Sequence, residues 1–348
     1  MPDTSDTRTR SFGFIGRVLI VLGLASLVFL LWQLRSMLLL IFGAILVCVI
    51  IRALARRILR YLPVPDGVAV AISVLSITAA LGLGGWLFGE QISAEVEEVA
   101  QNLPDAWTAL EQRLVQVGLD GELQQAVASI RDSAGAVLAN AGRFVLAIGG
   151  GITDAIVVIV GGVYLAAQPG MYRRGTIRLF PPRRRDVAAD ALDKSGKALR
   201  LWLKGQLISM TVVGVLTGLG LWLLGVPGAL ALGLIAALLE FIPLIGPIAA
   251  AVPGVLLALA VDPMLAVWTA LLYLVIQHVE GNVLQPLVQQ YAVHLPPVVL
   301  LFSLIGFGLL FGALGVLLAA PLTVVTYVLV QRLYVEEALE REEPRARS

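Results

Sequence analysis

The stretch ALALGLIAALLEFIPLIGPIAAAVPGVLLALA, residues 229 to 260, decides the fold class of this chain. It is apolar almost throughout, and one continuous helix of this length would measure about 48 Å, more than the bilayer core of about 30 Å. Pro243, Gly246 and Pro247 interrupt it near the middle, because a proline removes a helical hydrogen bond. The pattern predicts two half-helices joined by non-helical backbone, which membranes tolerate only where it is buried in protein or lines a cavity.

The whole chain has the composition of an integral membrane protein. Hydrophobic residues make up 58% of the 348 residues, charged residues only 14%, and the mean hydropathy is +0.90, far from soluble norms. Apolar runs long enough for a span occur near 17–32, 36–51, 67–89, 144–167 and 206–224, and in broken form from 229 to 331. We predict an all-α polytopic fold with roughly six to eight spans, the first of them a true span and not a cleaved signal peptide.

Arginine and lysine residues gather before the first predicted span, after the second, and in the link after the fourth. Short cytoplasmic loops collect these residues, so both termini are predicted to lie in the cytoplasm. The basic run PPRRRD, 181–186, is interpreted as a topology signal that contacts anionic lipid, and not as a nucleic-acid site. The predicted segments are a cytoplasmic tail 1–16, three spans 17–89, an outer insert 90–143, a span 144–167, a basic cytoplasmic link 168–204, a transport core 205–331 and a charged cytoplasmic tail 332–348.

The insert 90–143 is acidic, which predicts an extracytoplasmic location. Apolar residues recur at every third or fourth position from Ile92 to Val117, as on one face of a helix. A second stripe runs from Leu123 to Val137, so two amphipathic helices are predicted, the first bent or restarted at Pro104. Their stripes either pack on each other or meet the same helices of neighbouring subunits.

Glu240, Asp262 and Glu280 are the only charged residues between Gly205 and Gln331. An ionisable group at bilayer depth costs roughly 2.5–3.5 kcal/mol, so such groups usually face a cavity or a transport path. Asp262 precedes a proline and is interpreted as a turn at the membrane interface. Glu240 adjoins the break, where the carbonyl end of the first half-helix favours a proton or a cation. The alternative is a proline-kinked packing helix whose glutamate reaches outward.

A second broken segment, 296–330, resembles the first in plan. It carries glycines at its middle, which we interpret as hinge or close-packing positions: Gly306, Gly308, Gly312 and Gly315. Either both segments are kinked spans, or both are re-entrant hairpins that enter from opposite sides, as in several secondary transporters. The two alternatives place residues 278–294 on opposite sides of the membrane. Gly214 with Gly218, and Gly308 with Gly312, also have the spacing that favours close helix contacts.

The stretch QHVEGNVLQP, 277–286, carries a histidine, a glutamate and an asparagine within five positions, between apolar segments. If the helix that begins near 264 continues to Pro286, His278 and Asn282 share a face, and Glu280 points roughly the other way. Histidine changes protonation between pH 5 and 8, and a desolvated glutamate does so too, so the stretch can couple proton or cation movement to conformational change. The alternative is a polar helix end wetted by lipid headgroups.

Motifs of enzymes and nucleotide-driven pumps are absent from the sequence. It contains no HExxH, no P-loop and no GxSxG. The single cysteine, Cys48, excludes an intramolecular disulfide and a multi-cysteine metal site. We therefore predict neither an enzyme nor a cofactor, a metal site or a nucleic-acid partner, and any transport would depend on a gradient or be passive.

Five motifs in order resemble the autoinducer-2 exporter family of bacterial membrane proteins: WLKGQLISM (202–210), LLGVP (223–227), EFIPLIGP (240–247), EGNVLQP (280–286) and GALGVLLAAPL (312–322). The resemblance implies a multi-pass transporter of the bacterial inner membrane that forms homo-oligomers among membrane lipids. One member of that family exports the quorum-sensing furanone autoinducer-2, and others are described as sodium or lithium/proton antiporters.

We therefore predict a secondary transporter that exports a small polar metabolite of the autoinducer-2 type. The nearest alternative is a sodium or lithium/proton antiporter, and the alternative from another class is a non-transporting membrane scaffold or receptor. The predicted substrate or ion path consists of Glu240, Pro243, Gly246, Pro247, His278, Glu280, Asn282 and Gln206. The predicted hinge and close-packing positions are Pro286, Gly306, Gly308, Gly312, Gly315 and Pro321.

Overall fold

The computed structural model describes scattered positions between 16 and 33 and the continuous ranges 34–116, 152–284 and 296–339. Every regular element in these ranges is a helix or helical turn, which confirms the predicted all-α fold. In chain order they are α2 (Arg35–Tyr61), α3 (Asp66–Gln116), α5 (Ile152–Ala167), α6 (Pro169–Arg178), η1 (Pro182–Arg184), α7 (Arg185–Leu224), α8 (Ala229–Leu239), α9 (Ile245–Val261), α10 (Pro263–Val279), η2 (Glu280–Leu284), α12 (Pro297–Phe311), α13 (Ala313–Val330) and η3 (Gln331–Leu339).

The fold is that of a polytopic membrane protein. Within the described ranges, five helical segments are long and apolar enough to cross a membrane, and the total is six if the bent pair α5 and α6 forms one span. The five are Arg35–Tyr61, Asp66–Trp86, Pro182–Leu224, Pro263–Leu284 and Ala313–Val335. The predicted first span, 17–32, lies only partly within the described positions. Helices α8, α9 and α12 are shorter, because proline and glycine divide both predicted broken segments.

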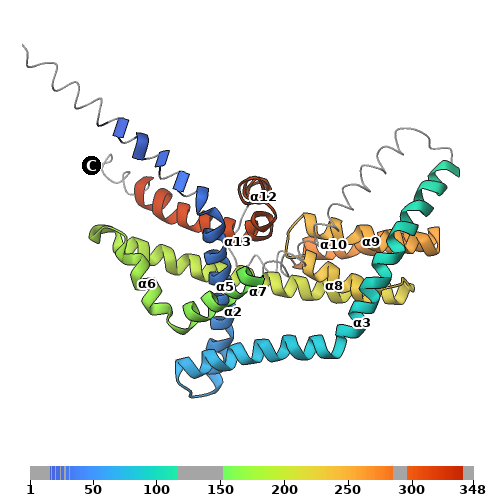
Figure 1. Ribbon diagram of the computed structural model, residues 1–348, viewed down its shortest axis with the longest axis horizontal. Helices are drawn as coiled ribbons and strands as arrows, with labels where there is room; N and C mark the ends of the chain where they lie inside the picture. The colour runs from blue at the N-terminus through green and yellow to red at the C-terminus, as the bar shows by residue number, and fades with distance from the viewer. Residues whose placement is uncertain are drawn as a thin grey trace, which may run out of the picture.

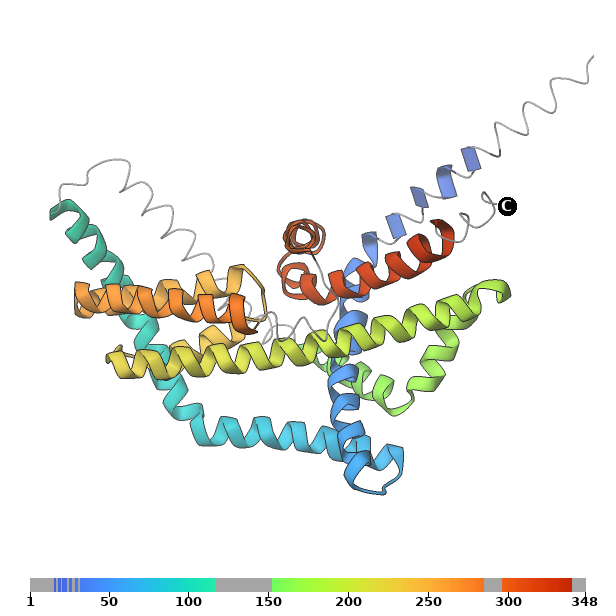
Figure 2. The ribbon, with the colours of Figure 1, turned by 180° about the vertical axis from the view of Figure 1, so that it is seen from behind.

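The 40-residue helix α7 carries both broken segments. Figures 1 and 2 show α8, α9 and α10 gathered along one half of α7, and α13 with η3 beside the other half. The contact with α13 is apolar along most of its length, where Ala198 packs against Val324 and Val328. It ends in an ion pair between Asp190 and Arg332. The long helix therefore connects two separate helical units.

Two glycines turn the chain back at the end of α7. Gly225 and Gly228 have φ values of 77° and 68°, a region that side chains other than glycine rarely adopt. The Val226 N–H donates to the Leu221 carbonyl at 3.0 Å, as in a Schellman helix end. The reversal lets α8 run back along α7. A Cβ atom on Gly233 would lie 2.7 Å from the Gly218 Cα, so these helices approach as closely as their glycines allow.

Helices α8 and α9 form a hairpin and not a kinked span. The end of α8 reaches the level of Gln206 and Ser209 on α7. Helix α9 then returns, because Leu257 near its end packs in one cluster with Leu221 and Ala229. The tip of the hairpin, residues 240–244, therefore lies deep along α7, and both of its outer ends lie near the turn that follows α7.

The hairpin tip is a tight reversal of the backbone. Leu244 has a φ of 71°, the only positive value among the described non-glycine residues. A Cβ atom on Gly246 would lie 2.0 Å from the Leu239 carbonyl oxygen, so no other residue fits there without backbone movement. Pro247 lies in the first turn of α9, which is where the sequence predicts it.

Asp262 starts α10 by capping it. Its carboxylate accepts hydrogen bonds from the N–H groups of Met264 and Leu265 at 2.7 and 3.1 Å, and Pro263 occupies the first helical position. The interpretation of Asp262 as a turn residue agrees with this geometry. Helix α10 then runs antiparallel to α9, since the Tyr273 hydroxyl lies against Gly254. Its far end reaches the level of the hairpin tip.

Helices α12 and α13 also fold back on each other. Gly312 lies between them with a φ of 68°. A Cβ atom on Gly315 would lie 2.0 Å from the Phe307 carbonyl oxygen, and one on Gly308 would lie 2.9 Å from Val316. Gly306 makes no such approach to any described residue. Pro321 is buried inside α13, and Pro286 lies outside the described residues.

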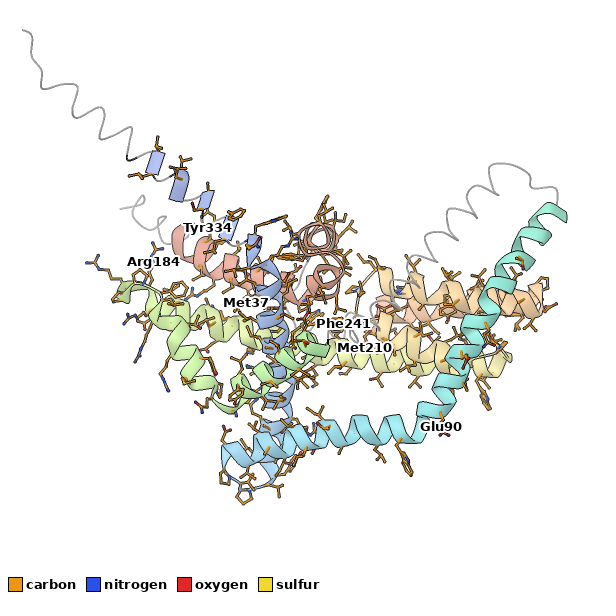
Figure 3. All side chains as sticks on the ribbon, viewed as in Figure 1. Met37, Glu90, Arg184, Met210, Phe241 and Tyr334 are labelled. Carbon is orange, nitrogen blue, oxygen red and sulfur yellow. The ribbon has the colours of Figure 1, made fainter. Side chains whose placement is uncertain are left out.

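Helix α3 does not end at residue 90, the predicted boundary between the third span and the outer insert. It runs without interruption through residue 90 and through Pro104, so the predicted restart at that proline does not occur. Figure 3 labels Glu90 where the helix changes direction. Beyond this bend α3 packs against α8 and α9. The predicted second amphipathic helix, with its stripe from Leu123 to Val137, lies outside the described residues.

Candidate functional site

The tip of the first hairpin buries Glu240. Its side chain is only 3% exposed, although it sits where α8 ends and the backbone turns. Gln206 on α7 donates from Nε2 to the Glu240 carbonyl oxygen at 2.7 Å, and this contact satisfies one of the free carbonyl groups at the helix end. The Ser209 hydroxyl, one turn further along α7, donates to Glu240 Oε1 at 3.4 Å. Two polar residues of α7 thus hold the tip in place.

Glu280 is the second buried carboxyl group at this level. It is 6% exposed and opens the π-helical turn η2 that follows α10, a kind of irregularity that often marks functional sites. The Gln277 amide donates to its Oε2 at 3.2 Å. Glu280 also acts electrostatically on Glu240, so the two carboxyl groups form one site. Two desolvated carboxylates repel each other, which favours a shared proton or a bound cation between them.

Glu240 keeps one acceptor free. Among the described residues, its Oε2 atom is buried and accepts no hydrogen bond. A buried polar group without a partner costs about 1–3 kcal/mol. A proton, a cation, a water molecule or a polar substrate group at this oxygen would remove that cost. The burial of both carboxyl groups and the unpaired Oε2 atom are therefore compatible with a binding role.

A cavity of about 700 Å³ lies between α7, α8, α9 and α10, and Glu280 is part of its wall. Most of its wall is aliphatic, and its polar groups include Thr217, Tyr273, Gln277 and Glu280. Thr217 Oγ1 and the Tyr273 hydroxyl are buried and have no hydrogen-bond partner among the described residues. Gly254 makes room for this hydroxyl, since a Cβ atom there would lie 2.5 Å from it. Two residues with unpaired buried hydroxyl groups and one with a carboxyl group thus belong to the cavity wall.

The structure brings most of the predicted path together at the hairpin tip. Pro243 lies in the tip with Glu240, whose carbonyl accepts from the Gln206 amide, and Gly246 and Pro247 lie in the first turn of α9 directly after it. His278 and Asn282 lie elsewhere: both side chains are exposed, and the Asn282 amide donates to the His278 carbonyl at 3.0 Å. They share a face that points away from the buried Glu280, as the helical spacing predicts.

Several residues of the site were not predicted. Ser209, Thr217, Tyr273 and Gln277 are hydroxyl and amide side chains on otherwise apolar helices. Ser209 follows Gln206 by three residues, so the two share one face of α7, and this spacing was the available signal. For Thr217 and Tyr273 no sequence signal separates a cavity-lining hydroxyl from one that faces lipid.

Trp202 connects the hairpin tip to the other half of the protein. Its ring packs edge-on against Phe241, with centroids 5.8 Å apart and planes at 78°. It also packs against the cluster that contains Leu199 and Leu318, which joins α7 to α13. Figure 3 labels Phe241 near the middle of α7, between the two helical units. A movement of the tip would therefore reach α13 through this tryptophan.

Glu95 fixes the outer end of the same hairpin. Its Oε2 accepts a hydrogen bond from the Ala231 N–H at 3.0 Å, in the first turn of α8. A carboxylate at a helix N-terminus satisfies a free N–H group and complements the helix dipole. The bent part of α3 thus caps a helix that lies 136 positions away in sequence.

We expect Glu95→Gln to loosen the first turn of α8, because the charge that complements the helix dipole is lost. The loss should be about 1 kcal/mol, which corresponds to roughly fivefold faster hydrogen exchange at the Ala231 amide. Glu97→Gln is the matched control, since Glu97 is exposed on the same helix and accepts a hydrogen bond from Gln101 within that helix. Equal exchange rates in the two variants would contradict the capping role.

Comparison with known proteins gives a consistent family. The model of the AI-2E family transporter matches residues 18–334. TqsA of Escherichia coli (strain K12), named as an AI-2 transport protein, is 26% identical over 301 residues, which cover 83% of this chain and 84% of TqsA. YrrI of Bacillus subtilis is 33% identical over 129 residues, and YueF of the same organism is 30% identical over 145 residues. These two matches cover 37% and 42% of this chain, but only 36% of YrrI and 39% of YueF.

Proposed function

We propose that this chain, which belongs to the AI-2E family of transporters, is a secondary transporter that exports a small polar metabolite of the autoinducer-2 type. Its membership and its apolar helices make it a membrane transporter. The finer proposal rests on one observation, the buried pair Glu240 and Glu280 at the tip of the α8–α9 hairpin, beside the cavity. The name of TqsA, an AI-2 transport protein, supports the substrate class.

The carboxyl pair provides a means of coupling to an ion gradient. When both groups are ionised they repel each other, and a proton or a cation between them removes the repulsion. Glu240 lies on the hairpin tip and Glu280 on the turn after α10, so their mutual position changes whenever either element moves. Occupancy of the pair and the conformation of the hairpin are therefore linked, which is what alternating access requires.

The cavity suits a small molecule with few polar groups. Its volume of about 700 Å³ is within the range of ligand sites. A ligand hydroxyl or carbonyl would pair with the free hydroxyl groups of Thr217 and Tyr273, and its carbon atoms would contact the aliphatic wall. A compact oxygen-rich metabolite of the autoinducer-2 type has this combination.

Sodium or lithium/proton antiport is the second candidate. It is favoured by the Oε2 atom of Glu240, which is buried and accepts no hydrogen bond from a described residue. With Glu280 close by, the pair offers carboxylate oxygens to a small cation, which oxygen ligands suit. In this case the cation itself is the cargo, and the cavity serves as its path.

For the arrangement in the membrane we propose a bacterial inner-membrane location with both termini in the cytoplasm. The arginine-rich segments before α2, at its end and around η1 support this orientation. We also propose a homo-oligomer that is assembled among membrane lipids; the exposed large apolar side chains of the described helices would contact lipid or neighbouring subunits. Cysteines introduced at the two termini would test the orientation, because a label that cannot cross the membrane should not react with them in intact cells.

Flux into proteoliposomes distinguishes the candidates. We expect a furanone metabolite of the autoinducer-2 type to move, and Tyr273→Phe to raise its KM about tenfold, since one hydrogen bond of about 1.4 kcal/mol is lost. Tyr164→Phe is the matched control, because Tyr164 is exposed on α5, away from the cavity.

Two other results of the flux experiment would contradict metabolite export. Sodium or lithium flux without metabolite flux, unaffected by Tyr273→Phe, would overturn metabolite export in favour of antiport. Absence of any flux in folded protein would favour a scaffold or receptor, which is the alternative from another class.

A further inference from the structure

A second cavity, separate from the carboxyl site, lies between the end of α2 and the middle of α7. Its volume is about 600 Å³. Five basic side chains line it: Arg56, Arg57, Arg60, Arg200 and Lys204. The first three belong to α2 and the last two to α7, so two helices that are distant in sequence bring their positive charges to one place.

These five cations have no acidic partner in the described ranges. Other basic residues of this part of the protein do have one: Arg52 pairs with Asp66 at 2.8 Å, and Arg173 pairs with Asp193. No described carboxylate forms an ion pair with any of the five cations of the cavity. Arg56 and Arg200 line the same cavity, so like charges gather there, and a bound anion would offset their repulsion.

The remainder of the cavity wall is aliphatic. Ile50 and Leu54 on α2, with Leu207 on α7, belong to it. On both helices the basic residues lie where the apolar sequence gives way to polar sequence, at the end of α2 and at the start of the apolar part of α7. Such a boundary in sequence marks the membrane interface. The cavity therefore has a charged part and an apolar part side by side.

We propose that this cavity is a binding site for an anionic phospholipid. Arginine guanidinium groups bind phosphate oxygens through paired hydrogen bonds, which suits a lipid phosphate. Free inorganic phosphate shares this chemistry, but it would leave the aliphatic wall in contact with nothing. A lipid satisfies both parts, with its phosphate among the cations and an acyl chain along Ile50, Leu54 and Leu207.

The site also has a position from which it can affect transport. Arg200 and Lys204 flank Trp202 on α7, and Trp202 contacts Phe241 at the hairpin tip. A lipid held between α2 and α7 fixes this part of α7 relative to α2. We therefore expect the bound lipid to stabilise the long helix on which the transport hairpin is built.

The wild-type protein provides the first test. In detergent, phosphatidylglycerol should remain bound in native mass spectra and raise the melting temperature, whereas phosphatidylcholine and inorganic phosphate should not. Equal stabilisation by phosphatidylcholine would overturn the proposal in favour of unspecific lipid binding. Full stabilisation by inorganic phosphate would overturn it in favour of a simple anion site.

A matched pair of variants provides the second test. The triple variant Arg56→Gln/Arg57→Gln/Arg200→Gln should bind phosphatidylglycerol about 100-fold more weakly than the wild type. Arg174→Gln/Arg178→Gln/Lys197→Gln removes the same charge from exposed positions on α6 and the first part of α7 that do not line the cavity, and should bind as the wild type does. Equal losses in both variants would assign the effect to net charge and overturn the site. The wild-type lipid series stands by itself if the first triple variant does not fold.

Discussion

Replacing Glu240 by glutamine should leave the protein folded but reduce its coupled flux by about 10- to 100-fold. Glutamine keeps the size of the side chain and an acceptor for the Ser209 hydroxyl, but it cannot lose or bind a proton in this pH range. Interactions of buried charged groups contribute about 1.5–3 kcal/mol each, which sets the expected factor. Flux into proteoliposomes under imposed pH and sodium gradients measures the loss.

Asp262→Asn is the matched control for this variant. It makes the same change from acid to amide in the same apolar third of the chain, but Asp262 is exposed and caps α10. Asparagine caps helices as well as aspartate does, so flux and stability should stay at the wild-type level. If Glu240→Gln transports at the full rate with unchanged dependence on the gradients, the carboxyl pair has no coupling role.

A double variant tests whether the two glutamates act as one site. Glu280→Gln alone should resemble Glu240→Gln, because each change removes the repulsion between the two groups. Residues that act as a unit give non-additive losses, so the double variant should be little worse than either single variant. Additive losses would mean that the carboxyl groups work at separate steps.

The sequence predicts a role for both glutamates, but it does not predict that they lie close together. Charged residues are so rare between 205 and 331 that each stands out against the cost of burial. Their contact depends on the path of the backbone between them, which includes the hairpin tip and the whole of α9 and α10. Hydrophobic periodicity predicts which residues form helices, but not the direction in which each helix leaves a turn. For that reason kinked spans and hairpins remained equal alternatives.

The turns between the helices determine the path of the chain more than the apolar runs do. Gly225, Gly228 and Gly312 occupy backbone conformations that favour glycine, and the chain reverses at each of these turns. A positive φ cannot be read from a single sequence, because most glycines of this chain lie inside helices. Gly306 illustrates the difficulty: it lies in the same glycine-rich stretch as Gly312, yet it makes no close contact with any described residue.

Helix α3 shows that a change from apolar to polar sequence does not always mark the end of a helix. After Asp66 at its start, its next acidic residue is Glu90, and the change from apolar to polar sequence predicts the end of a span there. The helix continues because nothing in its backbone chemistry stops it: helix formers follow Glu90, and the later Pro104 does not break it. What changes at Glu90 is the neighbour of the helix, which becomes the α8–α9 hairpin, including the Glu95 cap.

Gly246→Ala should have the largest effect on the stability of this fold. A Cβ atom at this position would lie 2.0 Å from the Leu239 carbonyl oxygen, 2.6 Å from its carbon and 3.0 Å from the Glu240 nitrogen. All three are backbone atoms, so no side-chain rotation relieves the overlap, and the hairpin tip must open. Overpacking of this kind typically costs about 1–3 kcal/mol, and here we expect the upper end of that range.

Opening the tip would also displace the site, since Glu240 follows Leu239 directly and the Gln206 amide is bonded to its carbonyl. The variant should therefore show a lower melting temperature in detergent together with lost flux. Gly306→Ala is the matched control, because alanine is the better helix former and a Cβ atom there meets no described residue. It should keep wild-type stability and flux. If Gly246→Ala leaves both the melting temperature and the flux unchanged, a Cβ atom fits at this position. The close approach of α9 to the end of α8 would then be wrong.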